Sequence, residues 1–488
     1  MKYCCAVLVA LTLFMGCTEP KEKSDELDHS QFAAEMQQLK DYFHIPGLAV
    51  LVQKGDSVLY EDYMGYADVA QKIEVDTATA FPIASITKVF AATALLKLAE
   101  EGKVALDMPI DTFLENSTFG DSIQVQHILS HTSQGEVGKH FYYSYRFGAL
   151  TPVIAKTSGT HFEDHIRNTL FEPLGLQDTY MLTDSSSVKP TMALPYNFER
   201  EVVPGVVEFG TSASAGMVST ARDMARFSRA LDGNTLLSPA SKALMYTPFA
   251  PSSPYGLGIF TQEIGNKKII WSYGQYDSYS SLLLKVPEEE LTWVLLANNN
   301  LMSDPARLIN GDVSASLFAL SFLNHYVFTE QALPLFEALE TTPPNTSEPH
   351  RRKLLAEALA ASFMARYDNA ELEKSKQLLR TLFAMYPEYL EYPHLNLLHT
   401  LTFIKSVHFH KELGPFEEFD AHIEAIAAKL LEEDPNNPYV NVYMGLYYDG
   451  KGSTEQSRVH FENIANAQNL SPFWYTAEAK NWLEQQEE

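Results

Sequence analysis

The placement of strand signals most constrains how this 488-residue chain can fold. Gly47–Tyr60 alternates apolar and polar residues around Lys54-Gly55-Asp56, a pattern typical of a hairpin. Strand signals then return near the far end of the same region, in residues 255–264, 268–271, 279–286 and 291–297. Helical periodicity lies between the two groups. We therefore expect one mainly antiparallel sheet built from both ends of the region and packed on a helical subdomain, an α+β (mixed α/β) fold.

A proline-rich segment, residues 333–350, separates this region from a different kind of sequence. Glycines and strand signals become rarer beyond it. Paired helical patterns follow in residues 351–386, 393–434 and 438–470. The chain is thus expected to hold a first domain over residues 30–332, a linker, and an all-α, repeat-like domain over 351–488. The third pair is similar to a tetratricopeptide repeat in the spacing of Gly445, Tyr448, Ser457 and Phe461. Such a domain is either a stabilising cap or a surface for a protein or peptide partner.

The N-terminus indicates export. Ala6–Met15 is an apolar run too short to span a bilayer, and Gly16-Cys17 follows it. This arrangement resembles a bacterial lipobox, which implies a signal peptide over residues 1–17, lipidation of Cys17 and a tether over residues 18–29. A plain signal peptide or an uncleaved anchor is the alternative. The expected location is the cell envelope, lipid-anchored, with the outer membrane favoured and the domain facing the periplasm or the surface.

The charge balance excludes some partners. Asp and Glu number 62 against 36 Lys and Arg, a net charge of −26. Nucleic acid needs clustered positive charge, so we expect none to bind, and we expect membrane contact only through the lipid anchor. The chain has no His-Glu-x-x-His motif and no glycine-rich phosphate loop, and we predict neither a metal nor a cofactor.

Ser85-Ile86-Thr87-Lys88 opens an apolar helical stretch that reaches about Ala99. Residues three apart share a helix face, so Ser85 and Lys88 are expected to lie together at the helix N-terminus. A serine becomes a nucleophile when a base takes its proton, and a lysine amine is a base only when its pKa is lowered. The N–H groups of the helix end also suit an oxyanion.

Five stretches in fixed order resemble the class C β-lactamase-like serine hydrolase family, which includes penicillin-binding proteins, D-amino-acid peptidases and esterases. The resemblance extends over about 300 residues of the chain. The matching stretches are residues 83–88 (IASITK), 128–133 (ILSHTS), 171–176 (FEPLGL), 214–224 (SAGMVSTARDM) and 286–288 (VPE).

The resemblance implies a catalytic tyrosine in Tyr-x-Asn or Tyr-x-Ser. The segment Phe141-Tyr142-Tyr143-Ser144 offers two candidates. An alignment without gaps places Tyr142 in the tyrosine position and Ser144 in the third, whereas the local pattern Phe-x-Tyr-Ser favours Tyr143 at the cost of a one-residue deletion. We favour Tyr142 and keep Tyr143 as the alternative, an aromatic lining the cleft if it is not catalytic.

The third family element, Lys-Thr-Gly or His-x-Gly, matches Ser272-Tyr273-Gly274. Gly274 would let the backbone approach the substrate, and the N–H of Gln275 would complete an oxyanion hole with that of Ser85. Ser272 stands where the family has a cation, which weakens recognition of a substrate carboxylate. Gln134 also departs from the family, which commonly has glycine there.

Two functions follow from the resemblance. The first is a serine hydrolase that forms an acyl-enzyme with a small ester, amide, D-Ala-type peptide or β-lactam-like substrate. Because Ser272 lacks a charge, an esterase or peptidase is favoured over an efficient β-lactamase. The second is a weak or silent binding protein of the same fold whose helical domain recruits a partner.

Overall fold

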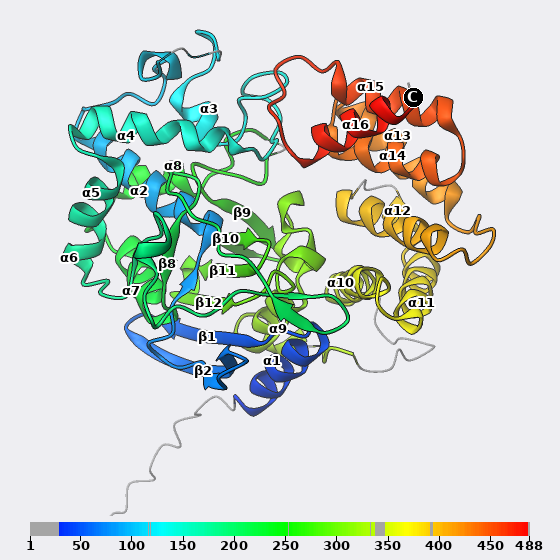
Figure 1. The fold of residues 1–488 in the computed structure, drawn as a ribbon, viewed down its shortest axis with the longest axis horizontal. Coiled ribbons are helices and arrows are strands. Elements are labelled where there is room, and N and C mark those ends of the chain that lie inside the picture. Colours follow the sequence, from blue (N-terminus) through cyan, green and yellow to red (C-terminus); the bar gives the residue numbers. More distant parts are fainter. Residues whose placement is uncertain are drawn as a thin grey trace, which may run out of the picture.

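The computed structural model describes residues 29–115, 117, 119–251, 253–331, 333–336, 347–390 and 394–486 (Figure 1). The predicted signal peptide, Cys17 and all of the tether except His29 lie outside these residues. Within this described part of the chain, no helix combines the length and the apolar character needed to cross a bilayer.

A seven-stranded antiparallel sheet forms the centre of the first domain, in the order β3-β2-β1-β12-β11-β10-β9. The strands are β1 (Gly47–Lys54), β2 (Ser57–Asp68), β3 (Ile73–Glu74), β9 (Phe260–Ile264), β10 (Lys267–Tyr276), β11 (Tyr279–Val286) and β12 (Leu291–Ala297). Leu48 pairs with Ala297 and Lys54 with Leu291. The predicted sheet built from both ends of the domain is therefore confirmed. The strand expected from residue 255 begins only at Phe260, since residues 255–259 form an irregular segment.

Helices cover both faces of this sheet. On one face lie α1 (Ser30–Tyr42) and α9 (Leu317–Tyr326), and on the other α2 (Thr87–Glu100) and α7 (Ala221–Asp232). In β12, Trp293 and Leu295 pack with the first face and Val294 and Leu296 with the second, as the two-residue period of a strand requires. The helical subdomain beyond α2 contains α3 (Val125–Leu129), α4 (Leu150–Ser158), α5 (Phe162–Ile166), α6 (Glu172–Leu174) and α8 (Pro239–Met245).

Two small sheets complete the first domain. The larger of them joins β4 (Phe81–Pro82), β8 (Met217–Ser219) and β5 (Tyr180–Met181), and the other pairs β6 (Tyr196–Phe198) with β7 (Val202–Pro204). Because β4 ends shortly before Ser85, its pairing with β8 positions the start of α2 relative to residues 217–219.

The C-terminal region is all-helical, as predicted. It consists of α10 (Glu348–Met364), α11 (Asn369–Met385), α12 (Leu395–His410), α13 (Asp420–Glu433), α14 (Pro438–Gly450), α15 (Thr454–Ala465) and α16 (Trp474–Gln485). In the α14–α15 pair a side chain on Gly445 would lie 2.7 Å from the Phe461 ring, and the Ser457 hydroxyl donates to the Gly445 carbonyl at 2.7 Å. These contacts explain why the pattern has glycine at 445, a small residue at 457 and an aromatic residue at 461. The likeness to tetratricopeptide repeats stays a prediction.

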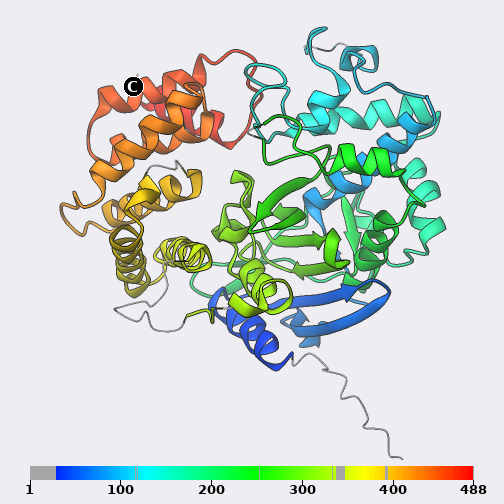
Figure 2. The same ribbon diagram turned by 180° about the vertical axis from the view of Figure 1, so that it is seen from behind.

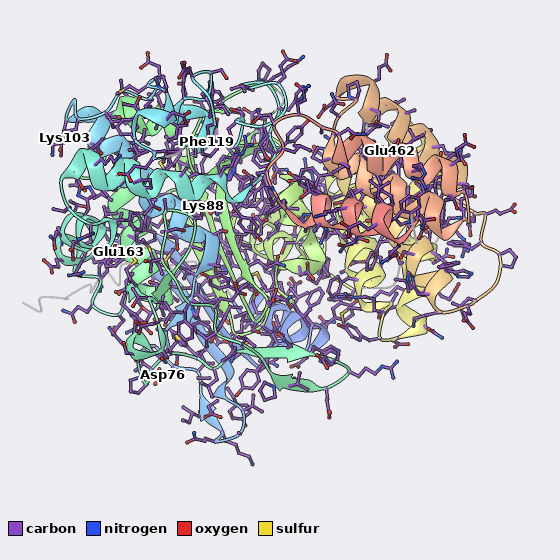
Figure 3. All side chains as sticks on the ribbon, turned by 45° about the horizontal axis from the view of Figure 1, so that its top comes forward. Asp76, Lys88, Lys103, Phe119, Glu163 and Glu462 are labelled. Atoms are coloured by element: carbon purple, nitrogen blue, oxygen red, sulfur yellow. The ribbon has the colours of Figure 1, made fainter. Side chains whose placement is uncertain are left out.

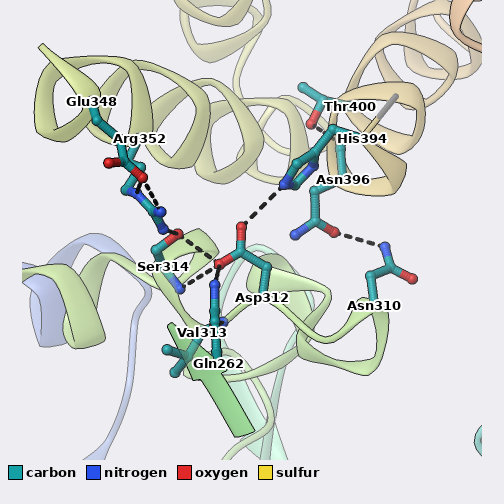
Figure 4. A network of polar contacts seen from close by, with 10 residues as sticks. All are labelled: Gln262, Asn310, Asp312, Val313, Ser314, Glu348, Arg352, His394, Asn396 and Thr400. Carbon is teal, nitrogen blue, oxygen red and sulfur yellow. Dashed lines mark hydrogen bonds and ion pairs between the residues drawn. The ribbon is translucent and has the colours of Figure 1, made fainter. Parts of the chain in front are cut away.

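The two regions pack side by side (Figures 1 and 2). A polar network joins them where residues 304–315 meet α10 and α12 (Figure 4). His394 Nε2 lies 3.2 Å from Asp312 Oδ2, and the Asn310 amide donates to Asn396 Oδ1 at 2.7 Å. Burial raises the pKa of Asp312, but the hydrogen bond and charge of His394 outweigh it and hold that pKa well below its usual range. The Asp312–His394 contact and the Asn310–Asn396 hydrogen bond therefore connect the helical domain to the segment that follows β12.

Candidate active site

Ser85 lies in a short 3₁₀ turn, Ala84–Ile86, between β4 and α2. Ala84 adopts a φ of +44°, which an L-residue tolerates only under constraint, at a cost of about 1–3 kcal/mol. The constraint comes from its neighbours: Ile83 N–H donates to the Met217 carbonyl at 2.9 Å, and the Ile83 carbonyl accepts from the Ser281 hydroxyl at 2.9 Å. The turn leaves Ser85 partly exposed between buried residues.

Lys88, labelled in Figure 3, lies one turn further along, near the start of α2. It is 3% exposed, and its Nζ lies 2.9 Å from Ser85 Oγ and 3.0 Å from the Ser214 carbonyl oxygen. Burial lowers the pKa of Lys88 to about 7. A large part of the lysine population is therefore neutral near pH 7 and able to accept the serine proton.

Tyr143 completes this group. Its ring centroid lies 4.9 Å from Lys88 Nζ, and it lines the cavity that contains Ser85. Burial raises the pKa of Tyr143 well above its usual range, while a hydrogen-bonding interaction with Ser85 lowers it in part. A neutral phenol next to the serine can pass a proton between the serine oxygen and the amine.

Tyr142, the tyrosine favoured from the ungapped alignment, is directed elsewhere. Its hydroxyl donates to Asp434 Oδ2 of the helical domain at 2.5 Å. Burial and the Asp434 carboxylate raise the pKa of Tyr142. The two adjacent side chains therefore point in different directions, Tyr143 to the cavity at Ser85 and Tyr142 to the helical domain. The geometry corrects the preference: Tyr143 faces the serine and the lysine, and Tyr142 faces the helical domain.

His131 and Ser144 help to hold Tyr143 in position. The His131 ring stacks on that of Tyr143 with centroids 4.3 Å apart, and His131 Nδ1 accepts the Ser144 N–H at 3.3 Å. Burial holds the pKa of His131 well below its ordinary value. Ser144 is 1% exposed and its hydroxyl accepts the Arg146 N–H, so it caps a turn and is not among the residues that line the described cavity.

Strand β10 approaches the serine turn closely at Gly274. A Cβ there would lie 2.1 Å from the Ile83 carbonyl oxygen, so only glycine fits. Ser272 is buried and is absent from the described cavity lining, whereas Tyr273 and Gln275 both line it. A substrate-binding role for Ser272, expected from its place in the family's third element, stays a prediction. The Gln275 side chain is held by Ser303 and Asp304, and the role of its backbone N–H stays a prediction.

Arg307 supplies a cation that the sequence did not indicate. It lines the same cavity, 3.4 Å from Asp304 Oδ1 and 5.4 Å from the Trp474 ring centroid. The residue has a φ of +47° in an irregular segment after β12. No spacing rule points to a lone arginine in such a segment, so only the tertiary fold brings it to the cleft.

The cavity at Ser85 has a volume of about 470 Å³, within the usual range for small-molecule sites. Its lining is rich in aromatic side chains and comes from both domains. The lining residues are Ser85, Tyr143, Tyr145, Glu208, Tyr273, Gln275, Tyr276, Asp277, Asp304, Arg307, Leu308, Ile309, Phe473 and Trp474. Three of these residues, Glu208, Asp277 and Asp304, are acidic, and burial raises the pKa of Glu208. Across the described residues no group of three or more His, Cys, Asp or Glu side chains could hold a metal ion.

An antiparallel sheet with flanking helices and a serine–lysine pair at the start of α2 defines the class of β-lactamase-like serine hydrolases. A family model described as beta-lactamase matches residues 32–313. Because that match covers more than half of the chain, the protein belongs to the beta-lactamase family.

Among curated relatives, the putative penicillin-binding protein PbpX of Bacillus subtilis (strain 168) is 28% identical over 242 residues, 44% of this chain and 61% of the relative. Penicillin-binding protein 4* of the same organism is 23% identical over 304 residues, 51% of this chain and 67% of the relative. The chain therefore spans less than two thirds of the length of the first of these. The solved structure of the octameric penicillin-binding protein homologue from Pyrococcus abyssi shares the fold, with a TM-score of 0.57, 20% identity and coverage of 68% of this chain and 82% of that one.

Proposed function

We propose that this protein is a serine hydrolase that works through an acyl-enzyme. The observation that carries the proposal is Lys88 Nζ at 2.9 Å from Ser85 Oγ, buried and with its pKa lowered to about 7. A surface lysine of ordinary pKa would stay protonated and could not serve as a base.

In the proposed reaction Ser85 Oγ attacks the substrate carbonyl carbon while its proton passes to Lys88, directly or through the Tyr143 phenol. The new bond joins Ser85 Oγ to the carbonyl carbon. The bond to the leaving group then breaks, and that group takes the proton from Lys88. Water attacks the acyl-enzyme in the second half, with Lys88 and Tyr143 again moving the proton, and Ser85 is released.

The substrate class is a small ester, amide or D-Ala-type peptide, or a β-lactam-like ring. The relatives named as penicillin-binding proteins support a D-Ala-type peptide or a β-lactam-like ring. The size of the cavity supports a small molecule. Strand β10 carries no cation at Ser272, but Arg307 lines the cavity and offers an alternative positive charge for a carboxylate. We further propose that the protein acts in the cell envelope, attached through Cys17.

Intact-protein mass spectrometry tests the proposal. The protein is incubated with a fluorophosphonate and, separately, with a fluorescent penicillin, with Ser85→Ala as control. A mass increase that is lost in the variant supports an activated serine, and the reagent that reacts separates a general esterase or peptidase from a penicillin-recognising enzyme. A folded protein that reacts with neither reagent would contradict the proposal and favour a binding protein.

A further inference from the structure

Two aromatic residues of the helical domain line the cavity at the nucleophile. Phe473 and Trp474 stand at the start of α16 and line the same space as Ser85. Phe473 contacts Tyr145 with ring centroids 5.0 Å apart, and Arg307 Cζ lies 5.4 Å from the Trp474 ring centroid. The helical domain thus closes one side of the cavity, against residues from two separate segments of the first domain.

This side of the cavity is firmly attached. The residues between α15 and α16 lie beside the loop after α3 in both views of the fold (Figures 1 and 2). Ser471 donates to Gln134 Oε1 through its N–H at 2.7 Å and through its hydroxyl at 2.8 Å. The Gln134 amide in turn donates to the Tyr142 carbonyl at 3.1 Å. Gln134 therefore connects the α15–α16 junction to the segment that carries Tyr143.

Asn469 makes a second connection. Arg146 Nη1 donates to Asn469 Oδ1 at 3.0 Å and Nη2 to the Asn469 carbonyl at 3.1 Å, while the Asn469 amide donates to the Ser133 carbonyl at 3.0 Å. The hydrogen bond from Tyr142 to Asp434 adds a third. The hydrogen bonds of Asn469 and Ser471 therefore fix the position of Phe473 and Trp474, which follow them closely in the chain.

We propose that Phe473 and Trp474 determine substrate specificity: they form a fixed aromatic wall that limits the site to compact substrates and excludes bulky groups next to the scissile bond. The inference rests on the proposed function for its chemistry, since Ser85 is the group to be reached. Large rigid aromatic side chains lose little conformational freedom on contact, which suits them to shape a site. The hydrogen bonds of Asn469 and Ser471 hold this wall in place, so it is not a loosely attached lid.

The first test compares two fluorophosphonates, one with short alkyl groups and one with a bulky dye close to phosphorus. In each reaction Ser85 Oγ bonds to phosphorus, fluoride leaves, and the serine proton passes to Lys88. Rates are read by intact-protein mass spectrometry. We expect Trp474→Ala and the double variant Phe473→Ala/Trp474→Ala to raise the ratio of bulky to compact labelling by about tenfold or more, equivalent to about 1.4 kcal/mol. Phe409→Ala, an exposed aromatic of the same domain that lies outside this cavity, is the matched control and should leave the ratio unchanged.

The second test does not depend on catalysis. The three cysteines of the chain are Cys4, Cys5 and Cys17, so a full chain with these changed to serine and carrying Ser85→Cys has a single thiol. Its alkylation by a small and by a bulky thiol reagent measures access to position 85. We expect the wall variants to speed only the bulky reagent. Equal bulky-to-small ratios in the folded parent and wall variants would overturn the inference. A wild-type chain inert to both fluorophosphonates would contradict the proposed hydrolase instead, and the thiol test would still decide the role of the wall.

Discussion

Two buried lysines of the first domain, Lys88 and Lys285, stand in opposite electrostatic settings. Lys285 on β11 lies 2.8 Å from Asp232 Oδ1 and donates to the Ser228 carbonyl at 2.9 Å. Burial lowers the pKa of Lys285, but the Asp232 charge opposes that shift. Lys88 has hydroxyl and carbonyl partners and, among the residues that the structure describes, no carboxylate partner, and burial lowers its pKa to about 7. The difference teaches that a missing counter-ion, and not burial alone, distinguishes the lysine proposed as a base from a structural cation.

The largest expected effect separates the two lysines directly. Lys88→Met removes the base and should slow acylation of Ser85 by about 10³-fold or more. Lys285→Met should leave acylation nearly unchanged but lower the free energy of unfolding by about 2–4 kcal/mol, because the partly buried Asp232 loses its partner. Labelling kinetics and urea unfolding of both variants measure the two quantities. A large acylation defect in folded Lys285→Met would break the comparison.

The two adjacent tyrosines provide the next effect. Tyr143→Phe keeps the ring but loses the phenol beside Ser85, and acylation should fall by about 10²-fold. Tyr142→Phe should acylate normally and lose about 1–2 kcal/mol of unfolding free energy, since its hydroxyl bonds to a carboxylate of the helical domain. The same two measurements apply. An acylation defect confined to Tyr142→Phe would restore the assignment that the ungapped alignment favoured.

The pH dependence of acylation tests the altered Lys88 pKa. The amine must be neutral to accept a proton, so the rate should rise up to about tenfold per pH unit below about pH 7 and level off above it. Second-order labelling rates from pH 5 to pH 9 measure this profile. Lys285→Met should show the same midpoint. A profile that keeps rising towards pH 10 would indicate a lysine of ordinary pKa.

The lowered pKa of Lys88 also predicts that the free energy of unfolding depends on pH. The folded-state pKa of Lys88 lies below its unfolded value, so the unfolded chain binds more protons between about pH 7 and pH 10.5. The Lys88 contribution to the unfolding free energy should therefore rise with pH across that window. Urea unfolding of the wild type and of Lys88→Met, compared at several pH values, isolates this contribution. An identical pH dependence in both proteins would contradict the assignment.

The smallest expected effect is that of Asp232→Asn, which makes Lys285 resemble Lys88. Because the Asp232 side chain is 23% exposed, water screens part of the interaction, and the loss of unfolding free energy should be about 1–2 kcal/mol at pH 7. The loss should diminish as pH rises, since Lys285 can then become neutral. Urea unfolding at pH 7 and pH 9 measures the difference. A loss that grows with pH would show that Lys285 does not titrate in this way.

The local sequence was sufficient to predict that Ser85 and Lys88 lie together and that both ends of the first domain enter one sheet. Ser85 and Lys88 are three residues apart, so helix geometry alone places them on one face. The family resemblance predicted a close backbone approach at Gly274 towards the substrate, and the structure shows a close approach there to the Ile83 carbonyl. The choice between Tyr142 and Tyr143 was not predictable, because both stand in an irregular segment where no period fixes which side chain faces inward.

The sequence by itself determined the antiparallel sheet with both ends of the first domain in it, the placement of Ser85 beside Lys88, and the all-helical C-terminal region. These follow from periodicity and short spacing, which act over a few residues. Only the tertiary structure decided that Tyr143 faces Ser85, that Arg307 reaches the cavity, and that Phe473 and Trp474 close it. Those contacts join residues that lie far apart in the chain, from Ser85 to Tyr143 and on to Arg307 and Trp474, and their geometry depends on how whole domains pack. Local physical chemistry therefore sets the reactive pair, and long-range packing sets its electrostatic surroundings and the shape of the space in front of it.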